Sequence, residues 1–424
     1  MKSGWPVKPL GEVCEVVNGG PPKTGIAAYW GGSHQWITPA EMGKRRSPYV
    51  GETERTVTGA GLDTSSARIL PQKSVILSSR APIGHLVINT AAMATNQGCK
   101  GLVPRTGLFY KYLYYYLVSI REHLDAMGTG ATFRELSGGR LKAVAIPLPP
   151  LAEQQRIVGL LDEAFAAIAT AKASAEKNLQ NTRAVFESFL HSTIASAFDS
   201  CAVVTMSEIA TDITDRDLLP PQKSPTGLPF VTIGNNDKTT RQIDFSNMFM
   251  VPRSYYDALK PNRKPKRGDV LYTVTGSFGI PVVMADDQHF CFQRHIGLVR
   301  PNRETLTACL YYLLLSPQLF RQADDGATGT AQRTVSLRVL LAFPVPKVPV
   351  ERQRGAIKAL DALELESDRL ADIHTRKLDA VKKSLLQHAV TGQLTSTDST
   401  DNVIDAAIIP KPTSKRSTSG CRHE

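Results

Sequence analysis

Two long segments of the chain, residues 160–198 and 356–391, contain neither glycine nor proline and have apolar side chains at helical spacing. In the first segment, successive positions lie alternately four and three residues apart, which is the period of a coiled coil. These positions are Leu161, Phe165, Ile168, Lys172, Ala175, Leu179, Thr182, Phe186 and Phe189. The second segment has a looser stripe, which consists of Leu363, Leu370, Ile373, Leu378, Val381 and Leu385. We expect a long helix over each segment.

A helix of about 40 residues is roughly 60 Å long, which is too long for one small domain to cover. The pattern therefore predicts that the two helices pack on each other. Their order and the single long connection between them favour an antiparallel pair with one globular domain at each end. Two separate amphipathic helices, each lying on its own domain, are the alternative interpretation.

The segment before each predicted helix has the composition of a mixed α+β domain. Short apolar runs such as 74–77 and 270–274 are separated by glycine and proline, which predicts strands joined by turns. Short helices are expected at 108–125 and 306–323. A Pro-x-Pro element then ends regular structure, because proline has no amide donor and biases the preceding residue toward extended geometry.

The two halves of the chain repeat the same order of blocks. Matching pairs are Leu10–Val13 with Met206–Ile209, Gln35–Thr38 with Pro229–Thr232, Lys73–Leu77 with Arg267–Leu271, Gly101–Val103 with Gly297–Val299, Leu113–Tyr115 with Leu310–Tyr312, Ile146–Pro149 with Phe343–Pro346, and Glu153–Arg156 with Glu351–Arg354. The offset stays between 194 and 199 residues throughout. This period is too long for a solenoid, so we expect two copies of a domain followed by a helix.

The repeat predicts five parts. Residues 1–150 form the first mixed domain, 151–198 the first long helix, 199–348 the second mixed domain, 349–394 the second long helix and 395–424 a tail. The tail is rich in serine and threonine and poor in apolar residues, so we expect disorder. Its basic residues Lys411, Lys415 and Arg416 could contact phosphate, but a solvated tail is the favoured interpretation.

Charge and composition narrow the class of partner. The net charge is +11 and the isoelectric point is near 9.3, which favours a polyanion but does not distinguish DNA, RNA and an acidic membrane surface. No apolar run is long enough to span a bilayer, and the N-terminus lacks the apolar core of a secretion signal, so we expect a cytoplasmic protein. The six cysteines are widely separated and are expected to be buried thiols.

The sequence lacks the motifs of the obvious enzyme classes. It has no glycine-rich dinucleotide motif, no Walker loop and no Asn/Asp-Pro-Pro-aromatic tetrapeptide of amino-methyltransferases. No Glu-x-Lys pair of the common restriction-nuclease site occurs, and the nine histidines have no metal-ligand spacing. We therefore expect a non-catalytic binding protein that holds no metal or cofactor of its own.

Several blocks in the first half resemble the target-recognition domain of specificity subunits of type I restriction-modification systems. The blocks are Asn18–Lys23, Tyr29–Gly32, Trp36–Met42, Ser78–Gly84 and Thr95–Lys100, and Pro147–Val158 resembles the start of the helical spacer that follows this domain. The second copy departs from this pattern: Tyr-Trp-Gly-Gly is absent, Ser-Ser-Arg becomes 275–277 (Thr-Gly-Ser), and Asn-Gln-Gly becomes 292–294 (Phe-Gln-Arg). Such divergence is expected if the two domains recognise different DNA sequences.

The resemblance implies a complex with two methylase (modification) subunits and, for restriction, with nuclease-translocase subunits. Each domain would recognise one half of an asymmetric bipartite site in double-stranded DNA. The helices would fix the gap between the halves and offer a docking surface for the methylases. S-adenosylmethionine would bind to the methylase and ATP to the motor, and no membrane would be involved.

Sequence recognition needs hydrogen-bonding side chains in the major groove and cations on the phosphates. For base contacts in loops at strand ends we predict Arg80, Asn96, Gln97 and Lys100 in the first domain, and Gln293, Arg294 and His295 in the second. For phosphate contacts we predict Lys44, Arg45, Arg46, Arg263, Lys264, Lys266 and Arg267. For each of them, an ordinary exposed polar side chain is an equally good interpretation, and Trp30 and Trp36 are expected in the core. Two other functions are less favoured. The basic loops and the divergence of the two domains argue against a coiled-coil scaffold that only joins proteins, and a single-chain methylating nuclease would need catalytic segments that this chain lacks.

Overall fold

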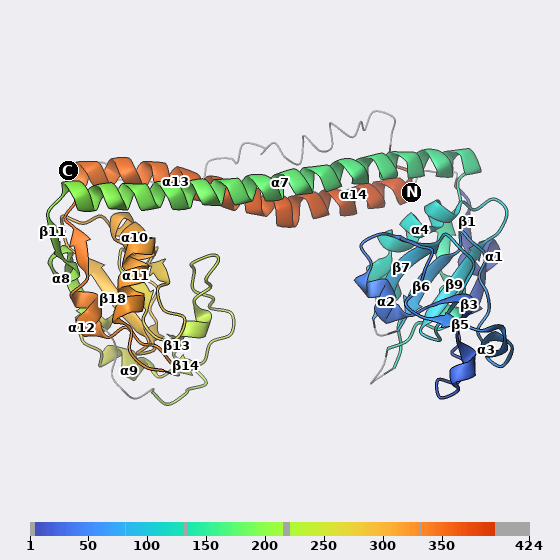
Figure 1. The fold of residues 1–424 in the computed structure, drawn as a ribbon, viewed down its shortest axis with the longest axis horizontal. Coiled ribbons are helices and arrows are strands. Elements are labelled where there is room, and N and C mark those ends of the chain that lie inside the picture. The colour runs from blue at the N-terminus through green and yellow to red at the C-terminus, as the bar shows by residue number, and fades with distance from the viewer. Residues whose placement is uncertain (1–4, 81, 131–133, 215–220, 331, 395–424) are drawn as a thin grey trace. The chain divides into compact units, whose positions relative to one another are not determined.

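The structure, a computed structural model, describes residues 5–394 except 81, 131–133, 215–220 and 331. The predicted tail, with its basic cluster and Cys421, lies outside the described residues. The described chain divides into two compact units (Figure 1). Unit 1 contains the residues up to Glu176 and those from Asp372 onward, and unit 2 is Lys177–Ala371.

Unit 1 is built on three small sheets. The largest has the order β2 (Cys14–Asn18), β9 (Cys99–Pro104), β6 (Val75–Ser79), β7 (Ile83–Asn89) and β4 (Tyr49–Val50). The second has the order β5 (Thr56–Val57), β3 (Trp30–Ile37) and β8 (Met93–Thr95), and the third pairs β1 (Val7–Pro9) with β10 (Ala145–Pro147). The central strand β6 is buried along its whole length, as its continuous apolar run predicts.

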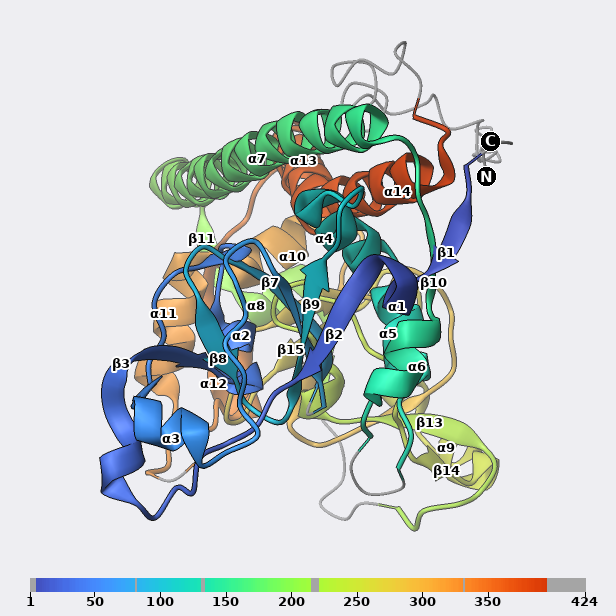
Figure 2. The same ribbon diagram turned by 90° about the vertical axis from the view of Figure 1, so that its right-hand side faces the viewer.

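The short helices of unit 1 cover and connect these sheets. They are α1 (Leu10–Val13), η1 (Ala27–Tyr29), α2 (Pro39–Lys44), α3 (Gly59–Asp63), α4 (Tyr110–Ser119), α5 (Arg121–Ala126) and α6 (Gly138–Ala143). Helix α4 packs on β6, β7 and β9 and joins the sheet to the long helices in one hydrophobic core (Figure 2).

Unit 2 repeats this plan. Its largest sheet has the order β12 (Ala210–Thr214), β18 (Ile296–Pro301), β15 (Val270–Thr273) and β16 (Pro281–Val283). The second sheet has the order β14 (Met250–Val251), β13 (Leu228–Val231) and β17 (Cys291–Phe292), and the third pairs β11 (Val203–Thr205) with β19 (Pro344–Pro346). Its short helices are α8 (Met206–Ile209), η2 (Ile233–Asn235), α9 (Arg253–Asp257), η3 (Pro261–Arg263), α10 (Thr307–Leu315), α11 (Pro317–Gly326) and α12 (Leu337–Leu341). Helix α10 packs on β15 and β16, as α4 packs on the sheet of unit 1.

Equivalent backbone hydrogen bonds establish how the repeats correspond. The Ile37 carbonyl accepts the Asn96 N–H in unit 1, and the Val231 carbonyl accepts the Gln293 N–H in unit 2, both at 2.9 Å. Asn96 is therefore equivalent to Gln293, one position away from the pairing with residue 292 that the sequence suggests. The duplication itself is present, but several blocks are shifted by one or two residues.

A second shift has a clear conformational cause. Lys73 (φ 67°) and Gly268 (φ 89°) both adopt the left-handed conformation directly before the central strand. Lys73 therefore corresponds to Gly268 and not to Arg267, because the turn needs a positive φ at this position, where glycine pays no steric cost. The pairing of Lys73 with Arg267 that the sequence suggests is therefore shifted by one residue.

The long helices are continuous over most of the predicted length. Helix α7 spans Leu151–Ser200, and the second segment consists of α13 (Val350–Asp372), a π-helical turn η4 (Ile373–Lys377) and α14 (Leu378–Thr391). The π turn explains the looser stripe of the second segment. Ile373 and Leu378 lie five residues apart, yet both are buried, since an i→i+5 turn returns the chain to the same face.

Segments of both long helices meet within each unit. In unit 1 the Lys172 ammonium pairs with Asp379, and Arg156 Nη2 lies 3.3 Å from the Leu394 carbonyl oxygen. In unit 2, Arg352 Nη1 lies 2.8 Å from Ser200 Oγ. Within unit 1, later residues of one helix face earlier residues of the other, so the two segments run antiparallel.

One position of the predicted seam in α7 is wrong. Phe189 is 36% exposed, whereas its neighbour Leu190 is 2% exposed. Leu190 and Ile194 pack with Phe186 in the hydrophobic core of unit 2, so this end of α7 buries a face toward the domain. The buried positions therefore leave the alternating spacing of four and three after Phe186.

A buried glutamine fixes the start of each long helix to its domain. Gln154 Oε1 accepts the Phe109 N–H at 2.8 Å, and its Nε2 donates to the carbonyls of Gly107 and Pro149 at 2.9 and 2.8 Å. Gln353 makes the same three kinds of bond in unit 2, to Leu306, Glu304 and Val348. Gln154 thus corresponds to Gln353, whereas the repeat in the sequence pairs Gln155 with Gln353.

The five cysteines of the described chain are free thiols. Cys14, Cys99 and Cys291 are buried as predicted, whereas Cys201 and Cys309 are only partly buried. Within the described ranges, no helix combines the length and the apolar composition that crossing a membrane requires.

Candidate nucleic-acid interface

The predicted base-contacting residues of unit 1 converge around the turn between β8 and β9. Asn96 and Gln97 form this turn, and Arg80 directly follows β6. A Cβ atom on Gly98 would lie 3.0 Å from Pro39 Cγ and 3.2 Å from Arg80 Cγ. The start of α2, the turn and Arg80 are therefore in direct contact.

Lys100 differs from the prediction. It lies inside β9 and not in a loop, it is only 6% exposed, and its Nζ lies 3.5 Å from Glu135 Oε1. Arg80 Nη1 lies 3.9 Å from the other Glu135 oxygen. Because the strand alternation turns Lys100 inward, it supports the carboxylate beside Arg80, while Arg80 stays partly exposed.

The predicted phosphate contacts of unit 1 follow α2. Arg45 pairs with the buried Glu41 at 2.6 Å, so its guanidinium is held inside the fold. Lys44 pairs with Glu54 at 3.1 Å, but its side chain is 68% exposed. An exposed pair of this kind is weak. Lys44 and the exposed Arg46 are therefore better placed than Arg45 to meet a phosphate.

In unit 2, Gln293, Arg294 and His295 form the turn between β17 and β18, the position of the turn that contains Asn96. Partial burial lowers the pKa of His295, and the neighbouring Arg294 charge lowers that pKa further. His295 is therefore neutral near pH 7, where an imidazole has one donor and one acceptor for hydrogen bonds.

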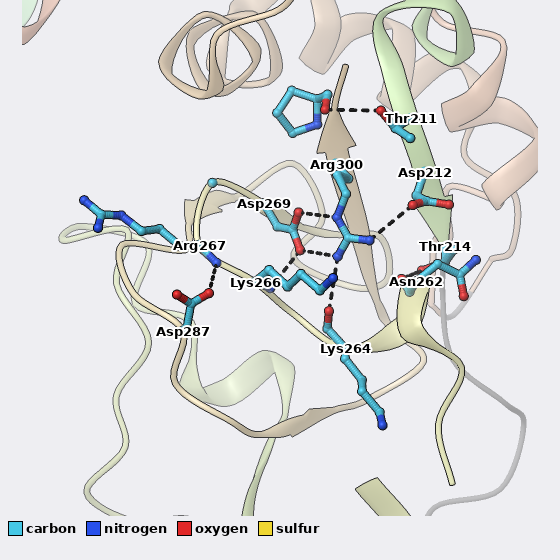
Figure 3. Close-up of polar contacts among 12 residues, drawn as sticks. Thr211, Asp212, Thr214, Asn262, Lys264, Lys266, Arg267, Asp269, Asp287 and Arg300 are labelled. Atoms are coloured by element: carbon cyan, nitrogen blue, oxygen red, sulfur yellow. Dashed lines mark hydrogen bonds and ion pairs between the residues drawn. The ribbon is translucent and has the colours of Figure 1, made fainter. Parts of the chain in front are cut away.

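The basic run of unit 2 is held by a buried ion pair (Figure 3). Arg300 donates to both carboxylate oxygens of Asp269 at 2.8 and 2.7 Å, to Asp212 at 3.1 Å and to the Lys264 carbonyl at 3.1 Å. Asp269 also accepts the Lys266 N–H at 2.9 Å. These bonds hold the backbone of the run, while the side chains of Lys264 and Arg267 extend away from the ion pair (Figure 3).

The two predicted groups of unit 2 are not brought together. Arg263, at the end of η3, and the following Lys266 and Arg267 precede β15, whereas the His295 carbonyl accepts the Val274 N–H just after that strand. At about 3.3 Å per strand residue, the four residues of β15 separate the two ends by roughly 13 Å. The basic run and the turn are therefore separate contact regions.

One arginine that sequence analysis missed stands out in unit 1. The Arg55 guanidinium carbon lies 3.7 Å from the centroid of the Trp30 ring and 5.3 Å from that of Trp36. Trp36 is buried, as predicted, and Trp30 is half-buried. The pair of tryptophans is the only signal in the sequence for this contact, because Arg55 lies before β5 and the tryptophans lie on β3.

In the part of the chain that the structure describes, no cluster of three or more histidine, cysteine or acidic side chains could hold a metal ion.

Comparisons with known proteins identify proteins that this chain resembles. Residues 2–178 match the family described as the type I restriction modification DNA specificity domain. The specificity subunit of the type I restriction enzyme MjaIX from Methanocaldococcus jannaschii is 39% identical over 159 residues, which are 37% of this chain and 37% of the relative. The first part of the chain is therefore similar to type I specificity subunits.

The likeness to this family extends into the second half of the chain. The specificity subunit of EcoBI from Escherichia coli is 21% identical over 369 residues, 78% of this chain and 76% of that relative. The fold resembles the crystal structure of the HsdS subunit from Thermoanaerobacter tengcongensis, with a TM-score of 0.61 and 18% identity over 93% of this chain and 98% of that one. The family and the names of these relatives denote specificity and not methylase or nuclease, in agreement with the predicted non-catalytic role.

Proposed function

We propose that this chain recognises a bipartite, asymmetric site in double-stranded DNA for a type I restriction-modification complex. Each unit would bind one half of the site. Two methylase subunits and the nuclease-translocase subunits would dock on the chain, and they would contribute S-adenosylmethionine and ATP chemistry. The chain itself would be non-catalytic and cytoplasmic.

One observation supports this proposal above the others: the two units share a scaffold but have different side chains at an equivalent backbone bridge, where Arg80 is half-buried and Thr275 is buried. Arg80 pairs with Glu135 in a backbone bridge, and the same bridge in unit 2 joins Thr275 to Thr334. The charged pair of unit 1 is thus replaced by two hydroxyls, whose oxygens lie 3.3 Å apart. Since base edges are distinguished by their donors and acceptors, unlike side chains on like scaffolds are suited to unlike half-sites.

The long helices suit the role of a spacer. We propose that they form one antiparallel coiled coil that sets the gap between the half-sites. The contacts between both helices within each unit and the buried glutamine at each helix start support a rigid connection from domain to spacer.

Methylation-sensitive sequencing of a host that expresses the chain with its methylase tests the proposal. We expect an asymmetric methylated motif in two parts. Changing Gln97 to Ala should alter one part, and changing Arg294 to Ala the other. Absence of any such motif, or duplex binding that is insensitive to salt, would favour the protein-joining scaffold instead.

The spacer has its own test. Four residues inserted after Glu176, with four more after Ala371 to keep the helices matched, lengthen each helix by about 6 Å. The gap in the methylated motif should then grow by about two base pairs, at roughly 3.4 Å each, with both recognised parts unchanged. Altered bases in either part would refute the spacer role.

A further inference from the structure

The side chain of Arg55 is rigidly placed, but its donors are unused. Its guanidinium lies on the Trp30 ring, and Trp30 in turn meets Trp36 edge-on, with centroids 5.0 Å apart. The described residues include no acceptor for its side-chain N–H groups. In contrast, Arg45 donates to Glu41 and to the Glu52 carbonyl.

Hydrogen bonds from both indoles fix the platform under Arg55. Trp36 Nε1 donates to the Gly20 carbonyl at 3.2 Å, and Trp30 Nε1 donates to the Lys23 carbonyl at 3.4 Å. The Arg55 carbonyl accepts the Trp36 N–H at 3.2 Å. A stacked guanidinium keeps its planar edge exposed and loses less side-chain entropy when that edge binds a ligand.

The stack lies between the two groups of predicted contacts in unit 1. Glu54, next to Arg55, pairs with Lys44 of the predicted phosphate segment. On the other side, β3 continues from Trp36 to Ile37, whose carbonyl accepts the N–H of Asn96. Arg55 is therefore connected to both groups, to Lys44 through the adjacent Glu54 and to Asn96 through Trp36 and Ile37 of β3.

Unit 2 has a different side chain at this backbone position. The Phe249 carbonyl accepts the Phe230 N–H at 3.0 Å, as the Arg55 carbonyl accepts that of Trp36. Phe249 stacks on Phe230, with ring centroids 4.8 Å apart. The cation over these rings in unit 2 is the Lys223 ammonium, 5.1 Å from the Phe249 centroid. Unit 2 therefore keeps the aromatic platform but has no guanidinium at this position, as expected of a residue that distinguishes two half-sites.

We infer that Arg55, stacked on Trp30, recognises a guanine in the half-site bound by unit 1. This inference rests on the proposed function. The in-plane donors of a guanidinium match the O6 and N7 acceptors of guanine in the major groove. The replacement of this arginine by Phe249 in unit 2 favours a base over a phosphate, because a phosphate contact carries no sequence information.

The test compares methylated motifs of the whole chain, co-expressed with its methylase, in three forms. Arg55→Met keeps an unbranched side chain but removes every donor. One guanine of one half-motif should become degenerate, with discrimination reduced about 10- to 100-fold, while the other half stays unchanged. Arg68→Ala is the matched control, because Arg68 is also an exposed arginine of unit 1 and has no aromatic platform. Its motif should equal that of the wild type.

Binding to a duplex with 7-deazaguanine at the affected position gives a second measurement. The loss of N7 should weaken wild-type binding but leave binding of Arg55→Met unaffected. A motif that Arg55→Met leaves intact would overturn the inference. If the wild type yields a bipartite motif, failure at Arg55 leaves the proposed function standing; if it yields none, the proposed function itself fails.

Discussion

Replacing Arg300 by methionine should destabilise unit 2 strongly. Arg300 pairs with Asp269 through two hydrogen bonds, and the Asp269 side chain is only 2% exposed. These hydrogen bonds, and then the Asp269 charge, raise the pKa of Arg300, which shows that the fold favours its charged form. Without Arg300, a buried carboxylate remains without its counter-charge, and the Lys264 carbonyl loses a donor.

The expected cost follows from that unpaired charge. Removing one partner of a buried ion pair costs about 3–5 kcal/mol, which lowers the melting temperature of a domain of this size by roughly 6 °C or more. Calorimetry of the whole chain should show the shift in the transition of unit 2. Arg369→Met is the matched control, because Arg369 and its partner Glu366 form an ion pair in which both side chains are exposed. We expect a loss below about 1 kcal/mol there.

A double variant isolates the physical cause. In Arg300→Met with Asp269→Asn, the amide oxygen can still accept the Lys266 N–H, but no charge is buried. This double variant should be more stable than Arg300→Met alone. If Arg300→Met melts no lower than Arg369→Met, or if the second change adds further destabilisation, the buried ion pair does not hold the basic run in the way described.

Two further predictions concern the helix anchors and the recognition turn. Gln154→Leu leaves one N–H and two carbonyls without their partner, and it should lower the free energy of unfolding of unit 1 by about 3 kcal/mol, measured by thermal unfolding. Gln155→Leu is the control, because Gln155 is exposed, and it should change this free energy by no more than about 0.5 kcal/mol. Equal losses in the two variants would refute the role of Gln154 as an anchor. His295 should titrate below pH 6.5 in NMR, because burial and the Arg294 charge lower its pKa. The folded state then opposes protonation of this imidazole. The contribution of His295 to the stability of the fold therefore declines as the pH falls below about 6.5. Arg294→Gln should raise the His295 midpoint and Arg294→Lys should leave it, and an unchanged midpoint in Arg294→Gln would contradict the stated role of the charge.

The repeat and the helical segments could be predicted because they depend on patterns along the chain. The spacing from Leu161 to Phe186 needs only a helix that buries one face, and α7 covers these residues. The shift to Leu190 could not be predicted, because it depends on the domain that this end of the helix meets. The Ile373–Leu378 spacing did appear in the sequence, but its meaning required the π turn.

The contact residues were less predictable, since partners distant in sequence decide which charged side chains are free. Lys100 belongs to a polar block, yet the pleat of β9 points it at Glu135, some 35 residues away along the chain. Arg55 has no motif around it, yet a tryptophan on another strand holds its guanidinium with the donors exposed. Charge and position along a strand therefore select candidates, whereas the pairing of each charge separates a side chain that supports the site from one that can bind a ligand. By this criterion, Arg46 and Arg55 are better candidates for contact with DNA than Arg45 and Lys100.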